Sequence, residues 1–158
     1  MQKEDIRFMR LAIKKARDGI KNGQTPFGAC IVKSGKVIAC SHNVVWKNCD
    51  ITAHAEIKAI RQACKKLKTI DLFGCTIYST CEPCPMCFSA CHWAGIRRIV
   101  FGCGIRVAGD FGFNELSISN LKMKGLAKSR VKILPGVLAE ESAELFRLWQ
   151  KQPNRRAY

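Results

Sequence analysis

Two short motifs in the middle of the chain carry residue types that bind metals and move protons. His54 and Glu56 stand two positions apart near the start of one predicted helix, and Cys84 and Cys87 open the next predicted helix. One imidazole and two thiolates provide three ligands for a tetrahedral zinc ion, and leave the fourth position open, as in catalytic zinc sites. The positive ends of the two helix dipoles would also favour thiolate over thiol at both cysteines.

Glu56 is close enough to His54 to approach such a metal without binding it. Zinc lowers the pKa of a coordinated water molecule to about 7. A carboxylate beside that water can carry its proton to a ring nitrogen and then to a leaving amine. The two motifs together therefore predict hydrolytic chemistry, with His54, Cys84 and Cys87 as ligands and Glu56 as proton shuttle. Either motif alone is far less specific, because a Cys-x-x-Cys pair also occurs in redox sites and structural zinc sites.

A rival interpretation uses a different set of cysteines. Cys81, Cys84, Cys87 and Cys91 have the spacing of a bacterial iron–sulfur run, which would make the protein an electron carrier. However, His92 rather than proline follows the last of these cysteines, and the chain contains no second run. This interpretation also gives the His54 motif no task, so the catalytic zinc site is favoured.

The elements that must position these motifs follow from the hydrophobic pattern. Apolar residues at helical spacing predict an amphipathic helix from about residue 6 to residue 20. Two β-rich runs separated by Ser34-Gly35 predict a hairpin. Asp50 or Thr52 is expected to cap the helix that carries His54 and runs to about Lys68. Further strands and helices are expected at residues 74–79 (strand), 85–94 (helix), 97–101 (strand), 131–134 (strand) and 140–150 (helix).

Strand, helix and strand in succession from residue 74 to residue 101 predict a parallel crossover. The glycine-rich segment 102–114 is expected to be an irregular functional loop. We see no repeat or linker that divides the chain, so residues 1–158 are expected to form a single domain.

Composition limits the class of protein. The chain has 158 residues, 47% of them hydrophobic, and a formal net charge of +15, which is typical of a folded domain rather than a disordered one. No window is long and apolar enough for a membrane span, and the charged start is unlike a secretory signal, so a cytoplasmic location is expected. The cysteines outside the motifs are expected to be small buried thiols; they are Cys30, Cys40, Cys49, Cys64, Cys75, Cys91 and Cys103.

The motif of His54 and Glu56 and the motif of Cys84 and Cys87 resemble those of the cytidine and deoxycytidylate deaminase superfamily, whose signature pairs H-x-E with P-C-x-x-C. The similarity also includes the segments 26–29, 52–57 and 79–87 and extends to the end of the chain. It implies a three-layer α/β/α sandwich with a mixed sheet of about five strands and one zinc ion per subunit. In the superfamily an asparagine after the second strand contacts the substrate ring, which implies that role for Asn43. By the same resemblance Phe27 and Trp93 would enclose the ring, and the backbone near Glu82 would bond to it.

Within the superfamily the sequence is similar to bacterial guanine deaminases, including its length and the final Tyr158. The resemblance implies a homodimer in which the C-terminal segment crosses to the partner subunit and closes its pocket. Where those enzymes carry an acidic pocket residue, this chain has Asn114 followed by Glu115. Glu115 either supplies that carboxylate or points elsewhere. The predicted reaction is hydrolytic deamination of guanine, or of another nucleobase or nucleoside.

Two further functions compete with this prediction. The segments 99–102 and 131–140 resemble tRNA wobble-adenosine deaminases, and the charge of +15 would suit phosphate contacts. However, the basic residues are spread along the chain, which is also typical of a solvated surface. A nucleic-acid-binding module without enzymatic activity would leave Glu56 with no role.

Overall fold

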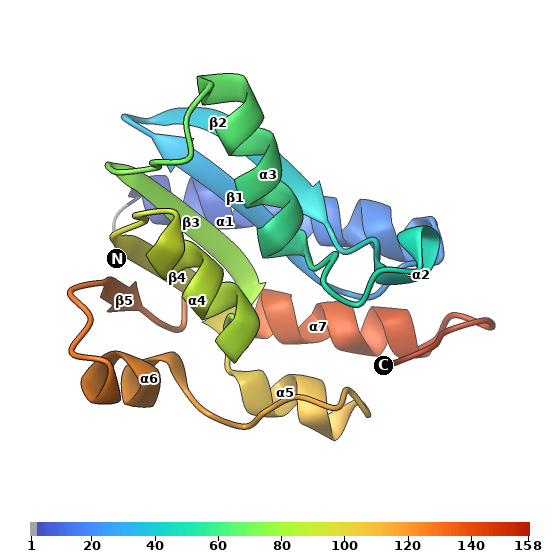
Figure 1. Cartoon of the computed structure of the whole chain (residues 1–158). Helices are drawn as coiled ribbons and strands as arrows, with labels where there is room; N and C mark the ends of the chain where they lie inside the picture. Colours follow the sequence, from blue (N-terminus) through green and yellow to red (C-terminus); the bar gives the residue numbers. More distant parts are fainter. Residues whose placement is uncertain (1–2) are drawn as a thin grey trace.

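Five strands form one mixed sheet in the order β2-β1-β3-β4-β5 (Figure 1). The computed structural model describes residues 3–158. Strand β1 pairs antiparallel with both β2 and β3, and β3, β4 and β5 run parallel. The predicted hairpin and the predicted parallel crossover are therefore both confirmed. The strands are β1 (Gly28–Lys33), β2 (Lys36–His42), β3 (Cys75–Cys81), β4 (Arg98–Cys103) and β5 (Lys132–Leu134).

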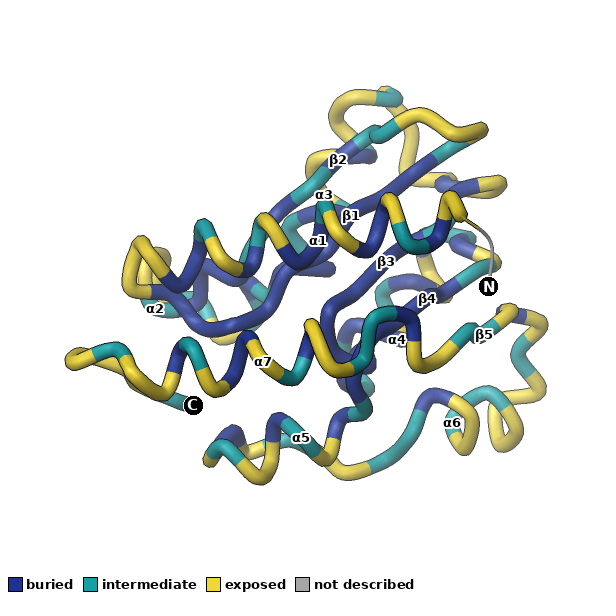
Figure 2. Tube along the Cα trace, turned by 180° about the vertical axis from the view of Figure 1, so that it is seen from behind, coloured by how far each residue is buried: buried dark blue, intermediate teal, exposed yellow. Residues whose placement is uncertain are grey.

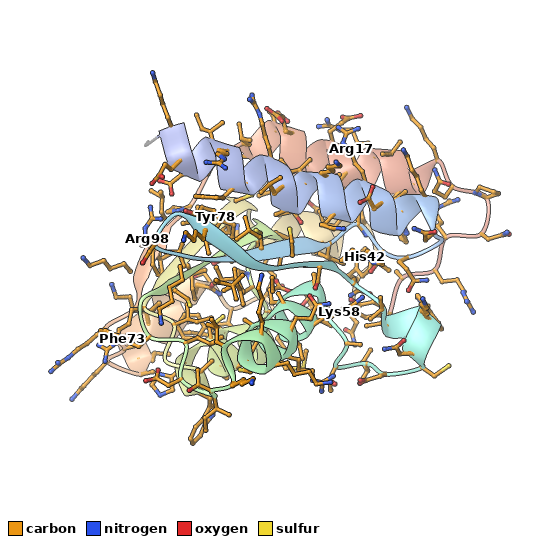
Figure 3. All side chains as sticks on the ribbon, turned by 90° about the horizontal axis from the view of Figure 1, so that it is seen from above. Arg17, His42, Lys58, Phe73, Tyr78 and Arg98 are labelled. Carbon is orange, nitrogen blue, oxygen red and sulfur yellow. The ribbon has the colours of Figure 1, made fainter. Side chains whose placement is uncertain are left out.

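Long helices cover both faces of the sheet, which confirms the three-layer α/β/α sandwich. Helices α1 (Lys3–Lys21) and α7 (Ala139–Gln150) lie side by side on one face, and α3 (Ala55–Leu67) and α4 (Pro85–Trp93) lie on the other (Figure 3). Helices α1 and α7 turn their buried sides toward the sheet and their exposed sides outward (Figure 2). In the described part of the chain, no helix is long and apolar enough to cross a membrane.

A buried ion pair fixes the start of α1 against the sheet. Arg98 on β4 donates two hydrogen bonds to the carboxylate of Asp5, at 2.8 and 2.9 Å, and the Tyr78 hydroxyl donates a third at 3.0 Å. Asp5 is only 2% exposed, so its charge depends on these partners. Arg98 and Tyr78 lie together at one end of the sheet (Figure 3).

The helix that carries His54 starts later than the sequence predicts. Neither Asp50 nor Thr52 caps it, because the Asp50 carboxylate accepts hydrogen bonds from the backbone and the hydroxyl of Thr52, at 2.8 and 2.6 Å. These bonds close a turn ahead of the helix. Helix α3 begins at Ala55, and His54 itself occupies the N-cap position.

Three short helices were not predicted, and one of them replaces part of the expected irregular loop at 102–114. They are α2 (Val45–Asn48), α5 (Ile105–Asp110) and α6 (Asn120–Leu126). The buried carboxylate of Glu82 accepts hydrogen bonds from the first backbone N–H of α5, at 3.2 Å, and from that of α6, at 2.7 Å. A bond supplied from a distant strand end leaves no local signal in the sequence, which explains why α5 was missed; α6 also has a local N-cap, because the Ser119 side chain accepts a hydrogen bond from the Lys122 backbone at 3.2 Å.

Gly28 permits the close approach of α1 to β1. A Cβ atom at this position would lie 2.8 Å from the backbone nitrogen of Ala16 and closer still to the carbonyl oxygen of Ala12. We expect Gly28→Ala to lower the free energy of unfolding by about 3 kcal/mol, because backbone atoms cannot yield as a flexible side chain can. Gly109→Ala is the matched control, since nothing lies within 4 Å of its added Cβ. Equal urea-unfolding midpoints for the two variants would contradict a steric requirement for glycine at position 28.

Candidate active site

His54 and Cys84 occupy equivalent backbone positions at the starts of two neighbouring helices. Each is the N-cap residue of its helix, with extended backbone angles and no side-chain capping bond, and Pro85 begins the first turn of α4. The starts of α3 and α4 meet near the end of β3 (Figure 1). Because neither side chain caps its own helix, both are free to turn toward the space between the helices.

The three predicted ligands come together. The Nδ1 atom of His54 lies 3.7 Å from the sulfur of Cys84 and 3.6 Å from that of Cys87, and all three candidate ligand atoms lie within 4.8 Å of one another. In a tetrahedral zinc site with ordinary bond lengths, nitrogen and sulfur ligands stand about 3.6 Å apart. The donor set and its spacing therefore fit zinc, with one coordination position left for another ligand.

The electrostatics of the group already favour a thiolate. The hydrogen bond from Cys87, together with His54, lowers the pKa of Cys84 to about 4 despite burial. Burial raises the pKa of Cys87 well above its ordinary value, and Cys84 raises it further. Burial alone would lower the pKa of His54, but the hydrogen bond with Cys84 and the nearby carboxylates raise it. A zinc ion would shift this balance and deprotonate both thiols.

Glu56 is buried beside the group but is not part of it. Its Oε1 accepts a hydrogen bond from the Ser79 hydroxyl at 2.8 Å, and its Oε2 lies 3.6 Å from the Cys87 sulfur. Burial raises the pKa of this carboxyl, and the charge of His54 opposes the increase. Ser79 thus fixes one oxygen, while the other faces the predicted metal position.

A cavity of about 250 Å³ opens directly onto the predicted ligands. Its walls come from the segments before α3, at the start of α4 and after α5, and from the end of the chain. The lining residues are Ile51, His54, Cys84, Met86, Asn114, Glu115 and Tyr158. The structure therefore brings Asn114, Glu115 and Tyr158, three of the predicted substrate residues, to the same cavity.

Tyr158 closes one side of this cavity within its own chain. Its hydroxyl accepts a hydrogen bond of 2.7 Å from the Asn43 amide, and its carbonyl accepts one of 2.9 Å from the Asn114 backbone. The Tyr158 ring lies 5.5 Å from the His54 ring, centre to centre. Asn43 is also held by the Val45 backbone N–H, which donates to its Oδ1. Asn43 therefore contacts the cavity through Tyr158 rather than lining it.

Glu115 places a second carboxyl at the cavity. Burial raises its pKa to about 7; the charge of Cys84 adds to this increase and that of His54 opposes it. The carboxyl is therefore close enough to the ligand group to feel its charges. A group with this pKa can change protonation near neutral pH.

Three other predicted substrate residues do not line the cavity. Phe27 is buried in an aromatic cluster, 4.9 Å from the Phe113 ring, and supports Tyr158 only through Phe113. Trp93 stands at the far end of α4 from the ligands and is 85% exposed. The backbone N–H of Glu82 donates a hydrogen bond of 2.8 Å to the carbonyl of Cys103, so it is not available to a substrate ring.

The cysteines of the iron–sulfur interpretation do not form one group. Among the described residues, the group that could hold a metal contains Cys84 and Cys87 with His54, not Cys81 or Cys91. Cys81 lies on β3 with its sulfur 3.7 Å from the carbonyl of Gly104. The side chains that sequence reasoning did not single out are Ser79, Ile51 and Met86. Of these, Ser79 and Met86 lay inside the segment 79–87 that carries the resemblance, whereas Ile51 had no signal of its own.

The chain is similar to known proteins of one family. The model for the cytidine and deoxycytidylate deaminase zinc-binding region matches residues 2–103. The chain belongs to the cytidine and deoxycytidylate deaminase family. It is 36% identical to a guanine deaminase of Bacillus subtilis over 152 residues, covering 96% of this chain and 97% of the relative. It is also 35% identical to a tRNA-specific adenosine deaminase of Aquifex aeolicus, covering 93% and 95% of the two chains.

The fold of this deaminase also matches that of a solved relative. The guanine deaminase from Nitrosomonas europaea superposes with a TM-score of 0.86 and 29% sequence identity, covering 93% of this chain and 85% of that one. The family match confirms the predicted superfamily, the hydrolytic deaminase class and zinc as the cofactor. Both predicted branches appear among the relatives.

Removal of one ligand should separate metal binding from folding. We expect Cys84→Ala to abolish stoichiometric zinc binding, because two ligands remain where three are needed. Cys91→Ala is the matched control, since Cys91 lies on the same helix and is buried but is not in the group. Metal analysis after gel filtration, with circular dichroism to verify folding, makes the measurement. Full zinc occupancy in Cys84→Ala, or loss of zinc in Cys91→Ala, would contradict the ligand set.

Proposed function

We propose that residues 1–158 act as one zinc-dependent deaminase domain that converts guanine and water to xanthine and ammonia. His54, Cys84 and Cys87 hold the zinc ion, and Glu56 is the proton shuttle. Glu115, Asn114 and Tyr158 form the substrate pocket, with Asn43 orienting Tyr158 or the ring. The similarity to guanine deaminases over nearly the whole chain supports this assignment.

The small size of the cavity is the observation that carries the choice of a free base. About 250 Å³ is available beside the predicted ligands, just below the roughly 300–1,000 Å³ of typical ligand pockets. Tyr158 covers one side through its bonds to Asn43 and Asn114. A base attached to RNA must bring its sugar and phosphates through the pocket mouth, whereas a free base needs no such passage.

Glu115 gives the pocket a preference among bases. Glu115 has a pKa of about 7, and in its ionised form it only accepts hydrogen bonds, so that form suits a ring that presents N–H donors. Guanine carries such donors at its ring nitrogens and its amino group. Adenine offers fewer ring N–H donors, so a carboxylate at this position favours guanine.

The residues around the cavity divide the work of hydrolysis. Zinc bound to this donor set supplies a Lewis acid that makes water nucleophilic near neutral pH. The Oε2 atom of Glu56, which faces Cys87, accepts the proton of the attacking water, while Ser79 holds Oε1 in place. Glu56 then delivers protons to a ring nitrogen and to the leaving amine, which departs as ammonia. Tyr158 limits the entry of bulk water from one side.

A tRNA adenosine deaminase is the second candidate function. The net charge of +15 suits a phosphate backbone, and the tRNA-specific relative covers the chain almost as completely as the guanine deaminase does. For this function the segment that carries Tyr158 has to move away from the cavity to admit a nucleotide.

Glu56→Gln tests the chemistry. We expect it to retain zinc, because Glu56 is not a ligand, and to lose ammonia release by about 10²- to 10⁴-fold, because the amide cannot accept the proton. Ammonia release is measured with guanine, guanosine, adenine, cytosine, cytidine and a tRNA anticodon stem-loop, using the zinc-loaded protein and Glu56→Gln as blank.

The substrate series decides between the candidates. Release from guanine alone supports the proposal, and release only from the stem-loop would transfer the function to RNA. Activity retained in Glu56→Gln would contradict the shuttle role without affecting the metal site.

We also propose that the protein is a homodimer. Trp93 is 85% exposed at the end of α4, so this end of the helix presents a large aromatic surface. A second copy would bury it, and exchange of the C-terminal segment would require the Tyr158 contacts to form between subunits. Light scattering at micromolar concentration should give twice the chain mass; a monomer would contradict the dimer but not the guanine assignment.

A further inference from the structure

Two cysteines face each other across the β1–β2 hairpin, on different elements from the predicted zinc ligands. Cys30 and Cys40 are direct partners in the antiparallel register of the two strands. Cys30 is completely buried, whereas Cys40 is half-buried and lies on β2, the edge strand of the sheet. The sulfur of Cys40 lies 3.7 Å from the carbonyl of Leu11 in α1, which places it between the sheet and that helix.

The spacing of directly opposed strand residues suits a covalent bond between these thiols. Such residues have Cα atoms about 4.5–5.5 Å apart, and disulfides span Cα distances of about 4.4–6.8 Å. The two side chains are also close enough for each thiol to shift the pKa of the other. No rearrangement of the hairpin register is needed to join them.

The surroundings give the two sulfurs different roles. The hydrogen bond from Cys30 lowers the pKa of Cys40; burial opposes this effect, Lys15 adds to it and Asp18 opposes it. The same hydrogen bond and burial raise the pKa of Cys30. Cys40, half-buried on the edge strand and with the lower pKa, is therefore the thiol that attacks first, and the fully buried Cys30 is reached only from within the protein.

We propose that Cys30 and Cys40 form a reversible disulfide by exchange with a small-molecule disulfide of the glutathione class. The Cys40 thiolate attacks one sulfur of glutathione disulfide and releases one glutathione thiolate. The Cys30 thiol then gives its proton to that thiolate, and its sulfur attacks Cys40 and releases the second glutathione. The balance is one protein dithiol and one glutathione disulfide converted to one protein disulfide and two glutathione thiols.

The same strand geometry makes the bond easy to reverse. Opposed Cβ atoms stand about 4.5–5.5 Å apart, whereas a disulfide prefers about 3.5–4.5 Å. Closure therefore draws the two strands together, and strained bonds of this kind are more readily reduced.

The chain contains a second pair of neighbouring thiols that serves as a control. Cys81 and Cys103 are partners on the parallel strands β3 and β4, and Cys103 raises the pKa of Cys81. Both are buried, at 3% and 4% exposure, so neither can attack a small disulfide from outside. In both pairs the two thiols are neighbours, but only the Cys30–Cys40 pair has a thiol that a small disulfide can reach from outside.

The test exposes the zinc-loaded protein to glutathione disulfide, alkylates the remaining thiols and identifies the cysteine peptides by mass spectrometry. The expected product is a Cys30–Cys40 linked peptide that dithiothreitol reduces, while Cys81 and Cys103 remain alkylated. The exposed Cys49 should form only a mixed disulfide, which shows that the reagent is active. A stable glutathione adduct on Cys40, a Cys84–Cys87 link, or no Cys30–Cys40 link would overturn the proposal.

Two variants test the order of attack. Cys30→Ala should accumulate the glutathione adduct on Cys40, because the resolving thiol is absent. Cys40→Ala, at the half-buried position, should leave Cys30 alkylatable only after unfolding. This variant provides the test if Cys30→Ala does not fold. Cys103→Ala should form the Cys30–Cys40 link at the unaltered rate. An adduct on Cys30 in Cys40→Ala would contradict the assignment of Cys40 as the attacking thiol.

Discussion

The site depends on one backbone constraint: two helices must begin at the same place beside the end of β3. His54 and Cys84 are both N-cap residues with extended backbone angles. The parallel pairing of β3 with β4 lays α4 across the sheet next to α3. If either helix began one residue later, its side chain would leave the shared space, and the 3.6–3.7 Å separations of nitrogen and sulfur would be lost.

Acidic groups are concentrated around this meeting point. Three acidic or thiol groups, Glu56, Cys84 and Cys87, are buried together with one imidazole. Buried charges of one sign are costly unless a partner of the opposite sign is present. A divalent cation is the natural partner for these groups. Burying several acidic groups together is unfavourable in the protein without metal, and the same arrangement makes a good metal site. The two helix dipoles, directed at the same space, act in the same sense.

The pocket is completed by contacts between distant parts of the chain. Tyr158 bonds to Asn43, 115 positions away, and packs against Phe113, which contacts Phe27. This aromatic cluster connects the start of the sheet, the segment after α5 and the end of the chain. Part of the cavity wall therefore comes from segments that lie outside the zinc motifs.

The sequence alone was enough to predict the group of candidate ligands, the neighbouring carboxylate, the hairpin and the parallel crossover, because each depends on short spacings or on local periodicity. Only the tertiary structure decided that Glu115 and Tyr158 reach the cavity, that Trp93 points away from it, and that the backbone N–H of Glu82 is already bonded. It also decided where α3, α5 and α6 begin, because Asp50 closes a turn and Glu82 caps two helices from a distant strand. Local pattern cannot encode such contacts, since their energy comes from partners that only folding brings together.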